Sequence, residues 1–248
     1  MNLILLSPEE IGPRGMVTLA DRRADHIREV LHGREGQSLR IGRLNGALGT
    51  GMIKTVGPEG VTLRCSFAEA MPERPRADLL LAMPRPKAMK RLWAPLASLG
   101  VGRIILTNAQ KVERYYFDSH VLEPAFYAEQ LKEGLEQAMD TRMPEVSIHR
   151  QLKVLIEDEL DTLAPDTFRI MADPSGSTRV TEALQENPHS RILLAVGPEG
   201  GWSEYERDLL AKRGFAAVGI GPRILRTDTA CIALLAMVHD AARDARKR

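Results

Sequence analysis

The chain has 248 residues, of which 44% are apolar, 4% aromatic and 27% charged. This composition excludes disordered and fibrous proteins, and the length allows one large domain or two smaller ones of roughly 100 to 200 residues each. The longest apolar run near the C-terminus, Ala230 to Val238, is far below the ~20 residues that a membrane span needs. Leu3 to Leu6 is too short for a secretory signal, so we expect a cytoplasmic protein with no membrane partner.

The net charge of +1 hides an uneven distribution of basic residues. Residues 84–114 contain seven basic side chains and one acidic side chain, and residues 11–54 contain eight basic and four acidic ones. Basic stretches of this kind suit a polyanionic partner, although solvated protein faces have the same appearance. Cys65 and Cys231 belong to no CxxC motif or Cys/His cluster, so we expect core thiols, no disulfide and no metal site.

The first 70 residues predict a small β-rich unit. Residues 21–31 have the apolar spacing of a short helix, and three strand-like runs separated by glycines follow at 39–44, 51–56 and 61–65. The stretch 69–78 contains two prolines among charged residues and has no periodicity, so the domain boundary is expected there.

From Leu79 onward, short apolar runs alternate with helical patterns. The expected strands are 79–83, 104–106, 146–148, 168–172, 192–196 and 216–220. The expected helices are 88–99, 122–139, 154–163, 180–186, 204–213 and 227–243. This alternation predicts an α/β fold with a parallel sheet covered by helices.

Two segments in this region indicate a ligand site. In the first, ILLAVGPEGGWSEYE (192–206), a buried-type strand ends in a glycine turn, and Ser203 with Glu206 forms a capping-box signature for the next helix. A strand, a glycine turn and a capped helix place backbone N–H groups at the carboxyl end of a parallel sheet, where polar ligands bind. The segment lacks the GK[ST] of a Walker A loop and the GxGxxG of a dinucleotide site, and alone it could be a plain tight turn.

The second segment, GIGPRILRTDT (219–229), lies between a predicted strand and the last predicted helix. Its glycines would permit close backbone approach to a ligand. Arg223 and Arg226 are three residues apart, so on a helical turn they would face one anion, with Asp228 nearby. Alternatively, the two arginines bridge to acidic residues at the start of a helix.

Together the two segments resemble the paired C-terminal signatures of the RsmE-type 16S rRNA uridine-N3 methyltransferases of the SPOUT superfamily, GPEGG and LGxRILRxET. The resemblance also covers DHIREVL (25–31), LGV (99–101) and the EQ…R…P-x-V pattern of 136–146. The chain departs from the family at four points: Ser98 replaces an acidic residue, His32 an arginine and Asp228 a glutamate, and the family's usual arginine near the N-terminus is missing from MNLILLSPEE.

The resemblance implies a PUA-like, RNA-binding β-barrel domain at 1–70, a linker at 71–78, and a SPOUT methyltransferase domain at 79–248. The SPOUT domain would be a parallel sheet with a C-terminal trefoil knot. The implied partners are 16S rRNA in the small ribosomal subunit and a second copy of the chain in a homodimer. The implied cofactor is S-adenosyl-L-methionine (SAM).

Carried over by position, the resemblance assigns SAM to Asp173, Val196, Gly197, Pro198, Glu199, Gly200, Gly201, Ile220, Gly221, Leu225 and Arg226. The hypothetical catalytic set, in which an arginine binds uracil and a carboxylate accepts or orients the N3 proton, is Arg226, Glu199, Asp228 and Arg223. The expected RNA-binding residues are Arg22, Arg23, Arg28, Arg85, Lys87, Lys90 and Arg91. Two alternatives stay open: methylation of another rRNA or tRNA position, and a non-catalytic RNA-binding assembly factor.

Overall fold

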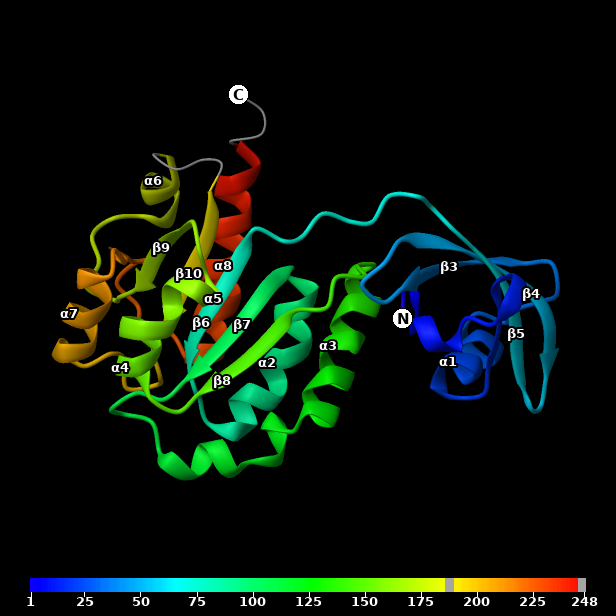
Figure 1. The fold of residues 1–248 in the computed structure, drawn as a ribbon, viewed down its shortest axis with the longest axis horizontal. Coiled ribbons are helices and arrows are strands. Elements are labelled where there is room, and N and C mark those ends of the chain that lie inside the picture. Colours follow the sequence, from blue (N-terminus) through cyan, green and yellow to red (C-terminus); the bar gives the residue numbers. More distant parts are fainter. Residues whose placement is uncertain (186–189, 245–248) are drawn as a thin grey trace. The chain divides into compact units, whose positions relative to one another are not determined.

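The computed structural model describes residues 1–185 and 190–244, and it divides the chain into two compact units (Figure 1). The N-terminal unit contains Met1–Arg74 and Gln130–Met143, and the C-terminal unit contains Pro75–Glu129 and Pro144–Arg248. This division differs from the expected one, because 130–143 joins the N-terminal unit and strand β6 (Ala77–Ala82) begins inside the expected linker.

The N-terminal unit is built around a five-stranded sheet with the order β1-β3-β4-β5-β2. β1 pairs with β3 in parallel, and the other neighbours are antiparallel. The strands are β1 (Ile4–Leu6), β2 (Met16–Leu19), β3 (Ser38–Arg43), β4 (Leu48–Gly57) and β5 (Gly60–Phe67). The structure contains the three predicted strands, whereas β1 and β2 were not predicted, because three or four residues are too few to display an alternating pattern.

A short helical segment packs its apolar face onto this sheet. α1 (Arg22–Asp25) begins after Asp21, whose side chain accepts a hydrogen bond from the Arg23 backbone N–H, and a π-helical turn (His26–Val30) follows. Ile27 is fully buried with Ile41, Ile53 and Leu63 of the sheet. The predicted helix at 21–31 is therefore present, although its second half is not α-helical.

Residues 130–143 complete the N-terminal unit through hydrogen bonds of their backbone and side chains. The N–H groups of Asn2 and Leu3 donate to the Glu136 carbonyl at 3.2 and 3.1 Å. The fully buried Thr141 donates its hydroxyl to the Gly46 carbonyl, and Arg142 Nε donates to the Pro72 carbonyl at 2.7 Å. The end of helix α3 (Pro124–Ala138) is thereby part of this unit.

The C-terminal unit contains a six-stranded sheet with the order β11-β9-β10-β6-β7-β8, and every neighbouring pair is parallel. The strands after β6 are β7 (Val101–Thr107), β8 (Glu145–His149), β9 (Thr167–Ala172), β10 (Arg191–Val196) and β11 (Ala216–Val218). The prediction of an α/β fold with a parallel sheet is confirmed. Every residue of β6 is buried, as expected for a central parallel strand covered on both faces.

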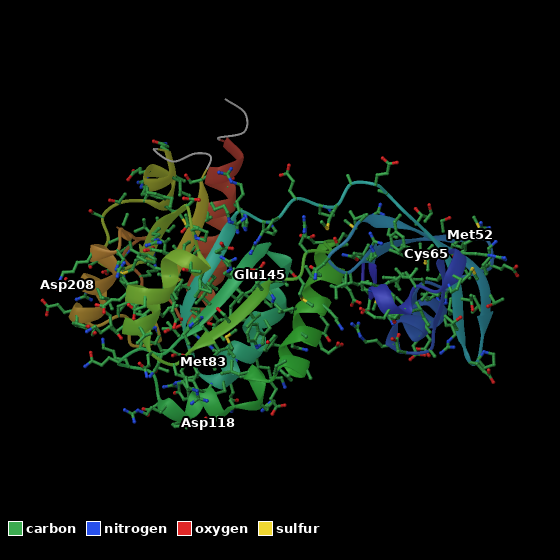
Figure 2. The ribbon with its side chains drawn as sticks, viewed as in Figure 1. Met52, Cys65, Met83, Asp118, Glu145 and Asp208 are labelled. Carbon is green, nitrogen blue, oxygen red and sulfur yellow. The ribbon has the colours of Figure 1, made fainter. Side chains whose placement is uncertain are left out.

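Helices lie against the sheet in Figure 1. α8 (Thr227–Asp244) packs on α2 (Pro86–Ser98), on α6 (Val180–Gln185), and on β6 and β10. α7 (Glu204–Lys212) follows the β10 strand. Figure 2 shows Asp118 and Asp208 at the surface, whereas Met83, which follows β6, is fully buried.

Two of the predicted elements differ from the structure, and one extends beyond the described residues. The predicted helix at 154–163 is α4 (Leu152–Val154), a π-helical turn (Leu155–Glu159) and α5 (Leu160–Leu163). The predicted strand at 216–220 ends at Val218, and residue 186 of the helix predicted at 180–186 lies outside the described residues. Within 1–185 and 190–244, no helix is both long and apolar enough to cross a membrane.

Candidate functional site

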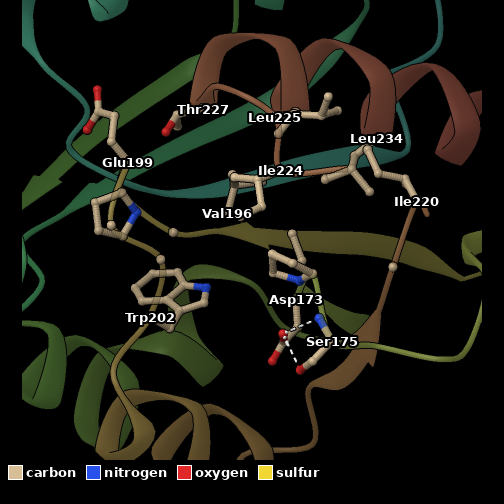
Figure 3. Close-up of a pocket in the computed structure, with 18 of the residues that line it drawn as sticks. Asp173, Ser175, Val196, Glu199, Trp202, Ile220, Ile224, Leu225, Thr227 and Leu234 are labelled. Carbon is tan, nitrogen blue, oxygen red and sulfur yellow. Dashed lines mark hydrogen bonds between the residues drawn. The ribbon is translucent and has the colours of Figure 1, made fainter. Parts of the chain in front are cut away.

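The loops that follow β9, β10 and β11 enclose a cavity of about 400 Å³ (Figure 3). Because the carboxyl ends of parallel strands meet at one edge of the sheet, these loops lie together even though their sequences are far apart. A cavity of this size is in the range of small-molecule sites, roughly 300 to 1,000 Å³. We call it the first cavity.

Glycines allow the three loops to approach closely. A Cβ on Gly219 would lie 2.2 Å from the Gly176 carbonyl oxygen, and one on Gly176 would lie 2.9 Å from the Val218 carbonyl carbon. A Cβ on Gly197 would lie 3.1 Å from the Trp202 backbone nitrogen. No side chain fits at Gly219 without moving the backbone, so the glycines of both motifs shape the wall of the cavity.

The wall of the first cavity is largely apolar, with a few polar groups at one side. Figure 3 shows Val196, Ile220, Leu225 and Leu234 around the space. Asp173 lies across from them, and its Oδ1 accepts hydrogen bonds from the Ser175 backbone N–H at 2.9 Å and hydroxyl at 2.7 Å. An apolar wall with a few fixed polar groups suits a flat, partly polar organic ligand.

The glycine loop after β10 is held in place from both sides. The Ser203 hydroxyl caps α7 by accepting from the Glu206 N–H, and Glu206 Oε2 accepts from the Ser203 N–H at 2.8 Å. The other oxygen of the buried Glu206 accepts from the Gln110 N–H at 2.7 Å. Lys111 Nζ donates to the Gly200 carbonyl at 2.7 Å. The capping box predicted at Ser203 is confirmed, and it ties the loop after β7 to the loop after β10.

A second cavity of about 460 Å³ shares residues Glu199 and Thr227 with the first. It lies where α2 and α8 begin, and its charged lining residues are Arg85, Lys87, Arg91, Glu199, Arg226 and Asp228. Four cationic side chains against two carboxylates make its lining positive, which favours an anionic ligand.

Ion pairs order the arginines of the second cavity. Arg91 Nη2 lies 2.7 Å from Asp228 Oδ2, and Arg226 Nη2 lies 3.3 Å from the same oxygen. The hydrogen bond from Arg91 holds the pKa of the Asp228 carboxyl below its usual value. Glu199 Oε1 accepts a hydrogen bond from the Arg85 backbone N–H at 3.0 Å. Asp228 is therefore a fixed anion between two arginines, whereas the exposed Glu199 faces both cavities.

A family model described as the RNA methyltransferase domain matches residues 72–239, which is more than half of the chain. The chain belongs to this RNA methyltransferase family. Ribosomal RNA small subunit methyltransferase E of Treponema pallidum is 29% identical over 244 residues, covering 96% of this chain and 90% of the relative. Ribosomal RNA small subunit methyltransferase E 1 of Borreliella burgdorferi is 26% identical and covers 94% and 95% of the two chains. The resemblance to the RsmE-type enzymes is confirmed.

A solved structure has the same fold over nearly the whole chain. The ribosomal RNA small subunit methyltransferase E of Neisseria gonorrhoeae, crystallised with S-adenosyl methionine, superposes with a TM-score of 0.77 at 21% sequence identity, and 97% of each chain is covered. At this identity the likeness concerns the fold.

The structure brings most of the predicted cofactor residues of this family member together. All of them line the first cavity except Arg226, which lines the second. Arg223 lines the first cavity, so the two arginines do not face one anion from a helical turn. The physical reason is that 219–226 is an irregular loop and α8 begins only at Thr227.

Several lining residues of the first cavity were not predicted from the sequence: Lys111, Trp202, Arg207 and Leu234. Trp202 immediately follows the glycine turn, so the motif itself could have indicated that Trp202 lines the cavity. Leu234 lies one helical turn or more inside α8, and only the tertiary fold places it against the loops.

The predicted RNA-binding residues fall into two groups. Arg85, Lys87 and Arg91 line the second cavity, and the Lys90 ammonium lies 5.8 Å from the centroid of the Phe126 ring. The others, Arg22, Arg23 and Arg28, belong to the N-terminal unit.

In the N-terminal unit, Arg23 has a structural role. All three of its guanidinium nitrogens donate hydrogen bonds, to Glu10, to Asp21 and to the Leu5 carbonyl, and its side chain is only 12% exposed. Its donors are therefore already used by the protein.

Among the described residues, no group of three or more His, Cys, Asp or Glu side chains is placed to hold a metal ion.

Proposed function

We propose that the chain transfers a methyl group from SAM to N3 of a specific uridine in 16S rRNA of the small ribosomal subunit. The observation that carries the proposal is the pair of adjoining cavities, which share Glu199 and Thr227. One is largely apolar and suits a nucleoside cofactor, and the other is positive and suits RNA. The names of the relatives, ribosomal RNA small subunit methyltransferase E, support the same substrate class.

The first cavity would hold SAM, which supplies an electrophilic methyl group on a sulfonium centre. Its contacts would be Asp173, Val196, Gly197, Pro198, Glu199, Gly200, Gly201, Ile220, Gly221 and Leu225, with Arg226 at the border between the cavities. Because the glycines allow a ligand to approach the backbone closely, SAM would be bound largely through backbone N–H and carbonyl groups. The structure of the Neisseria gonorrhoeae relative bound to S-adenosyl methionine supports this choice of cofactor.

The second cavity would receive the target nucleotide. A uridine in folded rRNA must be unpaired or extruded before its N3 can reach a methyl donor. Arg85, Lys87 and Arg91 would bind the phosphates around it, and Lys90, together with Arg22 and Arg28 of the N-terminal unit, would contact other parts of the RNA. Because the guanidinium N–H groups of Arg23 donate hydrogen bonds within the protein, we assign Arg23 no contact with RNA.

Methylation at N3 requires loss of the N3 proton and stabilisation of the negative charge that develops on the uracil carbonyl oxygens. The Arg226 guanidinium, held by Asp228, would stabilise that charge. Glu199 faces both cavities and would accept or orient the proton, whereas Asp228 would act as a positioning residue for Arg226 and Arg91. Arg223, in the first cavity, would contact the substrate from the cofactor side.

The finer features of the fold are part of the same proposal. We propose that the five-stranded sheet of residues 1–70 is a PUA-like RNA-binding barrel and that 79–248 forms a SPOUT domain with a trefoil knot at its C-terminus. The return of the chain from edge strand β11 to α8, which packs on the central strands β6 and β10, supports a threaded C-terminus. We also propose a cytoplasmic homodimer, as in the SPOUT superfamily.

Arg226→Ala tests the mechanism. Removing the donor that faces the developing charge is expected to lower kcat by about 100-fold, a typical loss for one such donor, while the Kd for SAM measured by calorimetry stays within about threefold. Arg179→Ala is the matched control, because Arg179 is 78% exposed and lines neither cavity. Unchanged turnover in Arg226→Ala with SAM still bound would contradict the mechanism, and loss of SAM binding would make Arg226 an architectural residue.

A further inference from the structure

Two adjacent tyrosines lie beside the second cavity without lining it. The rings of Tyr115 and Tyr116 meet edge to face, with centroids 4.9 Å apart and planes at 86°. Tyr116 is partly buried, and burial raises the pKa of its hydroxyl, while the nearby side chain of Arg85, a lining residue of the second cavity, acts to lower it. Tyr115 is 65% exposed. The pair therefore forms an aromatic surface, exposed at Tyr115, close to a lining residue of the second cavity.

The segment that carries these rings is anchored. Tyr115 and Tyr116 belong to a 3₁₀ turn (Arg114–Asp118) in which the next residue, Phe117, is buried. The Arg150 guanidinium lies 5.5 Å from the Phe117 ring centroid and donates to the Phe117 carbonyl at 3.2 Å. Tyr115 is thus presented on a fixed backbone, which lowers the entropic cost of binding a partner.

Charged residues accompany the exposed ring on its own segment. Lys111 and Arg114 are exposed basic residues, Glu113 and Asp118 are exposed acidic residues, and the basic side chain of Arg85 lies near the Tyr116 hydroxyl. An exposed aromatic side chain next to cations is the combination that binds unpaired nucleotides, because the ring stacks on a base while the cations bind the phosphates. The fold itself gives Tyr115 little to pack against, since most of its surface is in solvent.

We propose that Tyr115 stacks on an unpaired nucleobase that flanks the target nucleotide, with the Tyr116 ring supporting it. The proposal rests on the proposed function, because it takes the second cavity to be the site of the target nucleotide. Stacking on the neighbouring base would hold the strand open beside the cavity and favour extrusion of the target. Since every base has a π-face, Tyr115 would contribute affinity for unpaired RNA with little sequence preference.

The test compares Tyr115→Ala with Tyr115→Phe in the full chain. RNA affinity is measured by filter binding to small-subunit rRNA that lacks the methyl mark, and kcat and KM are measured for methyl transfer to the same RNA. Tyr115→Ala is expected to raise the RNA Kd and KM by about tenfold, as typical stacking contributions imply, whereas Tyr115→Phe stays within about twofold of the wild type. The Kd for SAM should not change in either variant.

Tyr205→Ala is the matched control, because Tyr205 is another strongly exposed tyrosine, 59% exposed, and lines neither cavity. It should leave RNA binding unchanged. An unchanged RNA Kd and KM in Tyr115→Ala, while the wild type methylates the RNA, would overturn the stacking proposal and leave the proposed function standing. A change in oligomeric state of Tyr115→Ala by light scattering would overturn it in favour of a contact between copies of the chain. If the wild type neither binds nor methylates the RNA, both proposals fail.

Discussion

At the scale of single residues, the two carboxylates of the second cavity have different surroundings. Asp228 lies between Arg91 and Arg226, and its side chain is 15% exposed. The hydrogen bond from Arg91 lowers the pKa of Asp228 and makes it a poor proton acceptor near neutral pH, since an efficient general base has a pKa close to the working pH. Glu199 accepts only a backbone hydrogen bond from Arg85 among the contacts identified for it, and it faces both cavities.

Asp228→Asn tests this division of roles. The pKa of the Asp228 carboxyl is lower in the folded protein than its ordinary value of 3.8. The stabilisation from its ion pairs is therefore fully present above pH 3.8, and it is lost only as the pH falls through the lowered pKa. Asp228 therefore does not titrate between pH 5 and 9. Loss of its charge-assisted hydrogen bonds is expected to lower kcat/KM by roughly 10-fold or more, while the shape of the pH profile stays the same. A profile whose shape changed between pH 5 and 9 in this variant would identify Asp228 as a titrating catalytic group.

At the scale of elements, the start of α7 fixes the glycine loop of the first cavity. Ser203 and Glu206 satisfy two backbone N–H groups at the start of the helix, and Glu206 also binds the Gln110 N–H. Ser203→Ala is expected to lower the free energy of unfolding by about 1 kcal/mol, the usual cost of losing such a cap, and to weaken SAM binding through the displaced loop.

Urea unfolding and calorimetry with SAM measure the two effects of Ser203→Ala. Ser203→Asp is the control, because an aspartate at the same position can still accept the hydrogen bond from the helix and should retain most of the stability. If Ser203→Ala unfolded at the same urea concentration as the wild type, the capping box would not contribute to the stability of the loop.

The same elements show what sequence patterns can and cannot predict. The runs LLLA in β6 and ILLAV in β10 are continuous and apolar because both faces of these strands are covered, so they predict a parallel sheet directly. Strand β1 has only three residues and shows no alternation. The π-helical turn in 155–159 leaves no mark on the apolar spacing, so the sequence predicts one continuous helix there.

At the scale of the whole molecule, long-range contacts limit what the sequence can predict. The glycine motifs indicate the first cavity because each one follows a strand whose carboxyl end lies at the same sheet edge. The second cavity joins Arg85 to Arg226, which are far apart in the chain, and no local pattern predicts that they meet. Similarly, 130–143 belongs to the N-terminal unit through contacts such as that of Thr141 with the Gly46 carbonyl, which only the fold creates.

The proposed function predicts one specific product. The decisive measurement is to incubate the purified protein with radiolabelled SAM and small ribosomal subunits from cells that lack this activity, to digest the RNA, and to identify the labelled nucleoside. We predict label in N3-methyluridine of 16S rRNA. Label in another nucleoside would contradict the uridine assignment, and no transfer despite bound SAM would contradict the enzymatic function.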